Sequence, residues 1–187
     1  MIIAGFGRVG RSVAQLLASR NIAYVAVDRD LRRVRGGRKD GMSVVYGNAT
    51  DRDLLEKLGA ERAALVLIAL GDTEATNKML GIIGRQWPGI KLLARARDAE
   101  HAETLAAMGV EDVVPETLEA SLQLGGQVLR TLGVPASAVN DTIERARAGG
   151  YQHAHEASET PPEASAKGLD RNSLSVGSSG SSLPRSV

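Results

Sequence analysis

A glycine-rich turn between an apolar run and an amphipathic stretch constrains the fold of this chain more than any other feature. The apolar run 1–4 leads directly into Gly5-Phe6-Gly7-Arg8-Val9-Gly10. Val9 and Val13 then begin a series of apolar residues at the spacing of one helix face. The order strand, turn, helix is the context in which a G-x-G-x-x-G pattern indicates phosphate binding rather than a simple turn.

Each glycine of this turn has its own expected role. Gly5 allows the tight turn, Gly7 lets the backbone approach a pyrophosphate, and Gly10 lets the helix pack closely on the strand. The free N–H groups and partial positive charge of the helix start attract phosphate oxygens. We therefore predict nucleotide contacts at Gly5, Phe6, Gly7, Arg8, Val9 and Gly10. The alternative is an α/β domain whose glycines only form a turn.

Strand and helix patterns alternate along the first two thirds of the chain. Further strands are predicted at 23–27, 43–46, 64–69, 91–94 and 112–114. Helices are predicted at 30–35, broken by Gly36-Gly37, and then at 51–58, 73–86 and 98–108. Short connections of this kind imply right-handed βαβ units and a parallel sheet covered on both faces. The predicted fold class is α/β, a doubly wound Rossmann-like sheet of strand order 3-2-1-4-5-6.

The pattern changes after Pro115, which divides the chain into residues 1–115, residues 116–150 and a tail at 151–187. Two amphipathic helices are expected at 116–132 and 137–147. They fold back on the sheet or pack against a second subunit, and the sequence favours neither. If they are left exposed, the leucines of the first helix would form an apolar patch that monomers rarely tolerate. The residues concerned are Leu118, Leu122, Leu129 and Leu132.

The tail and the composition narrow the classes of protein further. The serine-rich tail 151–187 is expected to be disordered, because it has too few large apolar residues to offset its ordering entropy. The formal net charge is +1 and cysteine is absent. These features argue against nucleic-acid binding, disulfides and thiolate metal sites. No apolar stretch approaches the roughly 20 residues that span a bilayer, so we expect a soluble protein of a reducing compartment without a metal site.

Polar residues that follow the predicted strands are the next candidates for nucleotide contacts, because ligands bind at the carboxyl ends of such strands. Asp28 follows the second strand at the position that binds a ribose hydroxyl, and its charge favours a nucleotide without a 2′-phosphate. Arg29 could instead bind such a phosphate, but we expect Asp28 to prevail because it holds the position at the end of the strand. The third strand is followed by Asn48, which could either read an adenine edge or serve as a turn residue. The further candidates are Ala49, Thr50 and Asp72.

The sequence disfavours catalysis. A short-chain dehydrogenase would place Lys four residues after Tyr, whereas Tyr24, Tyr46 and Tyr151 are followed at that spacing by Asp28, Thr50 and His155. No chain remains for a separate substrate domain. We therefore interpret the chain as a nucleotide sensor, with a small NAD-dependent oxidoreductase as the alternative.

Several segments in order resemble the RCK/KTN (TrkA-N) regulatory domain, most closely the cytosolic C-terminal domain of Kef-type glutathione-regulated K⁺/H⁺ antiporters. They are Ile2 to Gly10, Val27 to Asp30, Tyr46 to Thr50, Ala94 to Asp98 and Gly109 to Glu116. The resemblance covers residues 1–132 and implies an adenine nucleotide ligand (NAD, NADH, AMP or ATP). It also implies a homodimer that regulates a membrane-embedded potassium transporter or antiporter at the cytoplasmic face of the inner membrane. Asn48 and the Gly36-Gly37 pair depart from the family pattern.

Arg95 and Arg97 have two possible roles. In glutathione-gated relatives an arginine of this segment binds the carboxylates of the peptide, so the resemblance implies an effector site here. The alternative is an ion pair with Asp98 or Glu116, and we expect at most one of the two arginines to share the site of the glycine turn. The arginines at 32–38 are interpreted as a solvated helix face.

Overall fold

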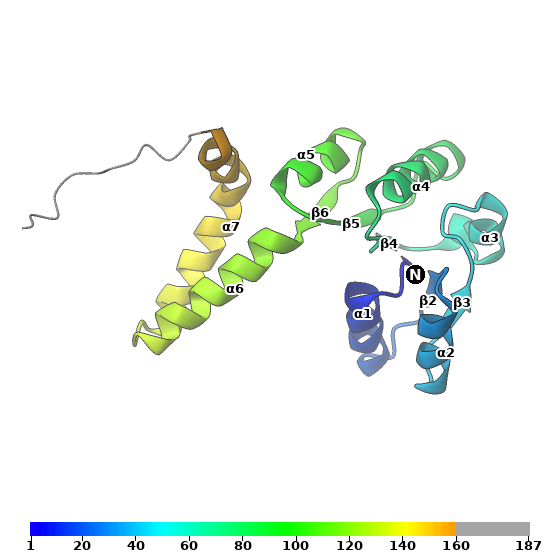
Figure 1. Ribbon diagram of the computed structural model, residues 1–187, viewed down its shortest axis with the longest axis horizontal. Helices are drawn as coiled ribbons and strands as arrows, with labels where there is room; N and C mark the ends of the chain where they lie inside the picture. The colour runs from blue at the N-terminus through cyan, green and yellow to red at the C-terminus, as the bar shows by residue number, and fades with distance from the viewer. Residues whose placement is uncertain (160–187) are drawn as a thin grey trace, which may run out of the picture.

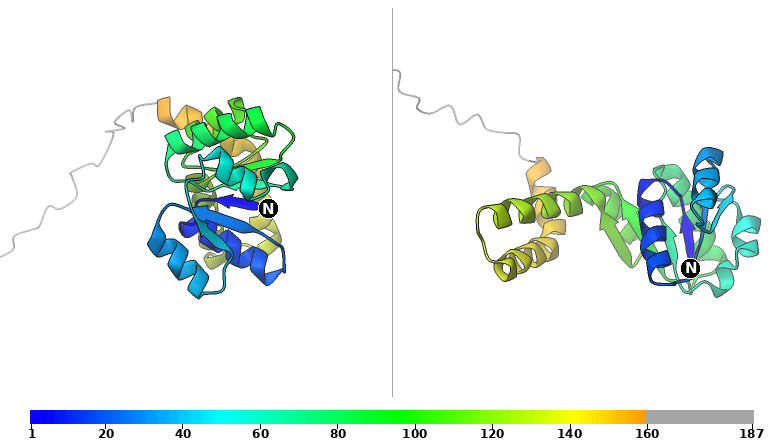
Figure 2. Two further views of the ribbon diagram at one scale, coloured as in Figure 1. Left: turned by 90° about the vertical axis from the view of Figure 1, so that its right-hand side faces the viewer. Right: turned by 90° about the horizontal axis from the view of Figure 1, so that it is seen from below.

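The computed structural model describes residues 1–159, with side chains to residue 149 (Figures 1 and 2). Its six parallel strands form one sheet in the order β3-β2-β1-β4-β5-β6, which confirms the predicted doubly wound topology. In chain order the strands are β1 (Ile2–Ala4), β2 (Val25–Asp28), β3 (Val44–Tyr46), β4 (Val66–Ile68), β5 (Leu92–Ala96) and β6 (Asp112–Pro115).

Helices cover both faces of the sheet because every helix carries one apolar face. On one side lie α1 (Arg8–Ser19) and α2 (Leu31–Lys39), whose Ala14 and Val34 pack on Ile3 of β1. On the other side lie α3 (Arg52–Lys57), a short 3₁₀ turn η1 (Ala60–Arg62), α4 (Thr73–Gln86) and α5 (Ala99–Ala107). Leu55, Met79 and Leu105 of these helices belong to a second buried cluster. Burial on both faces is the reason that the central strands are continuously apolar.

The predicted break at Gly36-Gly37 is wrong, since α2 continues through both glycines to Lys39. Gly37 is buried against the strand layer, where a Cβ would lie 2.5 Å from Cε1 of Phe6 and 2.9 Å from Cγ1 of Val44. The glycine is therefore part of a close helix–sheet contact and does not end the helix.

The last two helices form a hairpin that extends away from the sheet (Figures 1 and 2). Helix α6 (Glu116–Thr131) follows β6 directly, and α7 (Ala136–Glu159) returns antiparallel to it. The expected end of α7 at Arg147 is wrong, because the helix continues to Glu159. The rest of the predicted disordered tail, 160–187, lies outside the described residues. In the described part of the chain no helix is long and apolar enough to cross a membrane.

The exposed apolar residues of α6 and its C-terminal end agree only in part with those expected, because Leu132 is exposed and the other three leucines are not. Leu118, Leu122 and Leu129 are half-buried. The exposed stripe consists of Leu124 and Val128 of α6 and of Leu132, the C-cap residue directly after it, which are 69%, 51% and 75% exposed. We call Leu124, Val128 and Leu132 the α6 stripe. The spacing i, i+4, i+8 places the three side chains on one helix face.

Candidate functional site

A cavity of about 540 Å³ opens at the carboxyl edge of the sheet. It lies where β1 meets β2 on one side and β4 on the other, the point at which the strand order reverses. In open α/β sheets this switch point is the place where ligands bind. The volume is within the usual range for small-molecule sites, roughly 300–1,000 Å³. The cavity is lined by Gly5, Gly7, Arg8, Val9, Val27, Asp28, Arg29, Asp30, Arg33, Gly47, Asn48, Ala49, Ala69, Leu70, Gly71, Asp72, Ala75 and Arg95.

Two glycines of the turn are required by the packing of the protein itself. Gly5 has φ +96°, and a Cβ there would lie 2.9 Å from the carbonyl oxygen of Ala69. A Cβ on Gly10 would overlap the carbonyl oxygen of Gly5, so α1 comes as close to β1 as the sequence predicted. Gly10 is therefore structural and does not line the cavity.

Gly7 differs from Gly5 and Gly10 because nothing in the described part of the chain requires a glycine there. A Cβ at this position would meet only Nη1 of Arg33, at an ordinary distance of 3.6 Å. Its backbone φ is −76°, which any residue adopts. The missing side chain leaves open space directly above the start of α1, which is where a phosphate group would approach the backbone.

The N-terminus of α1 has no side-chain partner. No side chain caps it, and its first turn contains no acidic residue. By contrast, α2, α3, α4 and α5 each begin with an aspartate whose carboxylate accepts backbone N–H groups. Arg8 and Val9 of this first turn line the cavity. The free N–H groups and the positive end of the helix dipole therefore face the cavity, where they favour an anion.

Asp28, at the end of β2, is held by two backbone N–H groups. Its Oδ2 accepts from the N–H of Phe6 at 2.7 Å and its Oδ1 from the N–H of Asp30 at 2.8 Å. Through the first bond Asp28 anchors the glycine turn to the second strand. Phe6 contributes only its backbone to this network, since its side chain is buried in the core and does not line the cavity.

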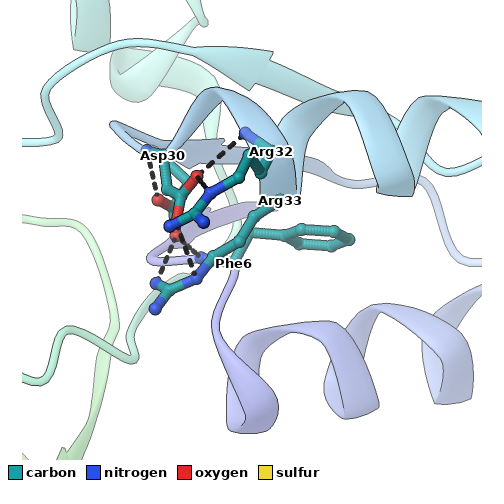
Figure 3. A network of polar contacts seen from close by, with 5 residues as sticks. Phe6, Asp30, Arg32 and Arg33 are labelled. Carbon is teal, nitrogen blue, oxygen red and sulfur yellow. Dashed lines mark hydrogen bonds and ion pairs between the residues drawn. The ribbon is translucent and has the colours of Figure 1, made fainter.

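Arg33 is a cavity residue that the sequence analysis missed. Its guanidinium lies above the end of β2, with Nη1 3.4 Å from Oδ2 of Asp28 and Nε 3.6 Å from Oδ2 of Asp30 (Figure 3). The side chain is 54% exposed. The first turn of α2 follows directly on the β2 end, so Arg33 is three residues from Asp30 on the same helix face. That i, i+3 spacing is the signal that could have identified it.

Asn48 follows β3 and folds the loop locally. Its Oδ1 accepts from both the backbone N–H and the hydroxyl of Thr50, each at 3.0 Å. This arrangement supports the alternative of a turn residue, because the side-chain oxygen closes an Asx-turn. Asn48 and the buried Ala49 line the cavity, whereas Thr50 does not.

Asp72 and Arg29 flank the cavity from opposite sides of the switch point. Asp72 caps α4, with Oδ1 accepting from the N–H groups of Glu74 and Ala75. Its Oδ2 lies 3.9 Å from Nη2 of Arg29, and both side chains are largely exposed. A contact of this length between exposed groups contributes little to stability.

The two arginines at the end of β5 are separated by the structure. Arg95 lines the cavity and pairs with Oε2 of Glu116, the first residue of α6, at 2.6 Å. Arg97 does not line the cavity and pairs with Asp98 at 2.8 Å. Its side-chain hydrogen bond keeps the pKa of Asp98 below the ordinary value. Both predicted ion pairs are thus present, and only Arg95 shares a site with the glycine turn.

Cationic groups outnumber anionic groups around the cavity. Four guanidinium groups and three carboxylates line it, together with the dipole of α1. The cations are Arg8, Arg29, Arg33 and Arg95, and the carboxylates are Asp28, Asp30 and Asp72. This balance favours a ligand that carries negative charge. In the described part of the chain no three acidic or histidine side chains gather as a metal site.

The fold and the site together define a doubly wound domain of the nucleotide-binding class. Residues 1–116 match the family described as the TrkA-N domain. The chain belongs to the TrkA-N domain family, as the resemblance of its segments predicted.

Proteins similar in sequence include K⁺ efflux systems. The chain is 41% identical over 147 residues to the chloroplastic K⁺ efflux antiporter 2 of Arabidopsis thaliana, an alignment that covers 79% of this chain and 12% of the antiporter. It is 34% identical over 167 residues to the glutathione-regulated potassium-efflux protein KefC of Cronobacter sakazakii, covering 89% of this chain and 27% of KefC. The chain thus spans a small part of the length of these proteins.

Two of the similar solved structures carry an adenine nucleotide. The Kef CTD of Shewanella denitrificans in its AMP-bound form matches with a TM-score of 0.71 and 28% identity, over 84% of this chain and 96% of that one. The GsuK channel bound to NAD matches with a TM-score of 0.60 and 26% identity, over 66% of this chain and 22% of that one.

Proposed function

We propose that this chain is a nucleotide-binding regulatory domain of a potassium transport system. The single observation that carries the proposal is the cavity at the switch point, into which the uncapped N-terminus of α1 and the open space at Gly7 both face. The relatives supply the physiological context, because they are K⁺ efflux antiporters. The transporter that this domain would regulate is a Kef-type antiporter or a Trk/Ktr-like system.

The ligand that we propose is an adenine nucleotide. The related structures carry AMP, NAD and ADP, which share the adenosine and its 5′-phosphate. In this chain the 5′-phosphate group would lie against the backbone at Gly7 and the N–H groups of α1. The ribose would lie at the end of β2, beside Asp28.

Regulation fits the cavity better than catalysis. The three carboxylates that line it, those of Asp28, Asp30 and Asp72, already accept backbone N–H groups. The described lining residues include no histidine, tyrosine, lysine, serine or threonine, the other side chains that commonly donate protons or act as nucleophiles. The alternative, a small NAD-dependent oxidoreductase, would need one of these groups next to the nicotinamide. Turnover of NADH with added carbonyl substrates would favour the alternative.

The contact between Arg95 and Glu116 offers a route from the cavity to α6. Arg95 lines the cavity, and its partner begins the helix that leaves the sheet. An anionic ligand that attracts Arg95 would compete with Glu116 and alter the start of α6. Ligand binding would then shift the hairpin between two arrangements through differential affinity.

The α6 stripe is the proposed surface for a second copy of the chain. Its three side chains are more than half exposed on one helix face, a pattern that monomers rarely leave open to water. A homodimer through α6 would join two nucleotide sites to one interface. Such a dimer would act on its membrane partner from the cytoplasmic side, and an effector of the glutathione type would bind beside Arg95.

The proposal is tested by isothermal titration of the full chain with AMP, ADP, NADH and NADPH. Gly7→Val should weaken binding at least about tenfold, because the branched side chain occupies the space above the α1 start. Gly89→Val is the matched control, since Gly89 also lies in open space but does not line the cavity. Unchanged affinity in folded Gly7→Val protein would overturn the site.

A further inference from the structure

The end of β2 presents a buried carboxylate and two exposed guanidinium groups to the cavity. The side chain of Asp28 is 5% exposed, whereas those of Arg33 and Arg29 are 54% and 76% exposed. At this end of the cavity the two guanidinium groups are therefore more accessible to a ligand than the carboxylate of Asp28. The expectation that Asp28 would repel a 2′-phosphate assumed an accessible, unpaired carboxylate.

The charge of Asp28 is already balanced within the protein. Its two oxygens accept from the N–H groups of Phe6 and Asp30, and Nη1 of Arg33 lies 3.4 Å from Oδ2. Both oxygens thus have partners before any ribose arrives. A carboxylate covered by a guanidinium contributes little repulsion to a phosphate placed on the far side of that guanidinium.

Asp30 does not reverse this balance. Its Oδ1 accepts from the N–H of Arg32 at 2.8 Å, and its Oδ2 lies 3.6 Å from Nε of Arg33 (Figure 3). The hydrogen bond from Arg32 lowers the pKa of Asp30, so the carboxylate stays charged as the cap of α2. The carboxylate of Asp30 thus interacts with groups of the first turn of α2.

Arg33 retains the capacity to bind a phosphate. A guanidinium has five N–H donors in a planar fork, and Arg33 directs only Nη1 and Nε toward aspartates, at the long distances of 3.4 and 3.6 Å. The contacts with the two aspartates do not involve Nη2, and the side chain as a whole is 54% exposed. Arginine binds phosphate through two parallel hydrogen bonds, a geometry that lysine cannot reproduce.

We propose, building on the nucleotide site above, that this end of the cavity selects a 2′-phosphorylated adenine nucleotide of the NADP(H) class. In this assignment Arg33 is the specificity-determining residue. Arg29, which also lines the cavity, is held only by a 3.9 Å contact with Asp72 and adds a second cation beside the same ribose. The ligand that this domain senses would then be NADP(H), which differs from the AMP, NAD and ADP carried by the related structures cited above.

The test compares nucleotides that differ only in the phosphate on the ribose. Isothermal titration of the full chain should find 2′,5′-ADP binding about 10- to 100-fold more tightly than 5′-AMP, and NADPH binding more tightly than NADH by the same factor. With Arg33→Ala the affinity for NADPH should fall by that factor, while the affinity for NADH stays equal or rises because Asp28 is uncovered. A merely structural arginine would change both affinities in the same direction.

Arg32→Ala is the matched control. Arg32 sits next to Arg33 on the same helix, so its removal changes the net charge equally, but its side chain is 93% exposed and does not line the cavity. This variant should keep the preference for NADPH. Equal binding of NADH and NADPH by the unmodified chain overturns the inference and leaves the nucleotide site intact.

Two further outcomes are decisive. Binding of 3′,5′-ADP as tightly as 2′,5′-ADP would overturn the assignment of the 2′ position. Absence of binding for every adenine nucleotide would remove the proposed function itself, and this inference with it.

Discussion

The sheet with its covering helices and the α6–α7 hairpin are stabilised by different interactions. In the sheet, the central strands are fully covered by helices on both faces, and Ile3 and Ile68 have no exposed surface. In residues 116–149 of the hairpin only Gly126 and Val139 are buried. Its two helices depend instead on a contact of Gly126 with Ile143 and on the ion pair of Glu119 with Arg147.

This difference separates ligand recognition from response. The cavity residues stand at strand ends whose geometry is fixed by core packing. The hairpin leaves the sheet at the junction of β6 and α6, where Arg95 pairs with Glu116. A region that buries little apolar surface changes its arrangement at low cost in free energy, whereas the core of the sheet does not.

The largest effect on stability is expected at the close contact between α1 and the end of β1. Gly10→Ala should lower the free energy of unfolding by about 3 kcal/mol or more, because the new Cβ overlaps a backbone oxygen that cannot move aside. Urea denaturation measures the change.

Gly84→Ala in α4 is the matched control, since a Cβ there meets nothing within 4 Å. It should stabilise the protein by roughly 0.5–1 kcal/mol. A Gly10→Ala protein as stable as the unmodified chain would show that α1 does not need this close approach.

The next largest effect is expected on assembly through the hairpin. Leu124→Glu combined with Leu132→Glu should weaken the proposed dimer at least about 100-fold, because each buried leucine contributes roughly 1.5–3 kcal/mol. Analytical ultracentrifugation gives the dissociation constant. Leu16→Glu is the control, since Leu16 of α1 is 68% exposed but lies outside α6. A monomeric unmodified chain at tens of micromolar would exclude the interface.

Much of the sheet half could be predicted from the sequence because its determinants are local. Each parallel strand that is buried on both faces forms a continuous apolar run, and each helix start has an aspartate or a glycine turn. The handedness of βαβ units then leaves few topologies, and the predicted order 3-2-1-4-5-6 is confirmed. The cavity at the glycine turn followed from the same rules.

The errors arose where the outcome depends on distant contacts. Glycine has a low helix propensity, so Gly37 was expected to end the helix. In the structure Phe6 and Val44 leave no room for a larger residue at this position of α2. The i, i+3 spacing of Asp30 and Arg33 indicates their contact, but the position of Arg33 over Asp28 depends on how α2 packs beside β2. In α6, the leucines at 118, 122 and 129 read as one stripe with Leu132, whereas the position of α7 leaves a different set exposed.

The smallest effect concerns the ion pair that joins the two hairpin helices. Arg147 binds Glu119 through two parallel hydrogen bonds, Nε to Oε1 and Nη2 to Oε2, each of 2.8 Å. Glu119→Gln should lower the free energy of opening of the hairpin by about 1 kcal/mol, since the pair is only partly shielded from water. Hydrogen exchange of the α6 amides measures this opening separately from that of the sheet. Glu144→Gln is the control, because the more exposed Glu144 contacts the same guanidinium through one bond and should contribute less.

The stabilisation of the hairpin by the ion pair of Glu119 with Arg147 depends on pH in a definite direction. The hydrogen bond from Arg147 lowers the pKa of Glu119 below its ordinary value of 4.5 in the folded chain. The folded hairpin therefore binds the proton less readily than the open one, and the stabilisation is complete above pH 4.5 and is lost as the pH falls through the lowered pKa. The unmodified chain and Glu119→Gln should accordingly differ at pH 7 and converge toward pH 3. A difference that persists at pH 3 would mean that packing of the side chain, rather than its charge, holds the two helices together.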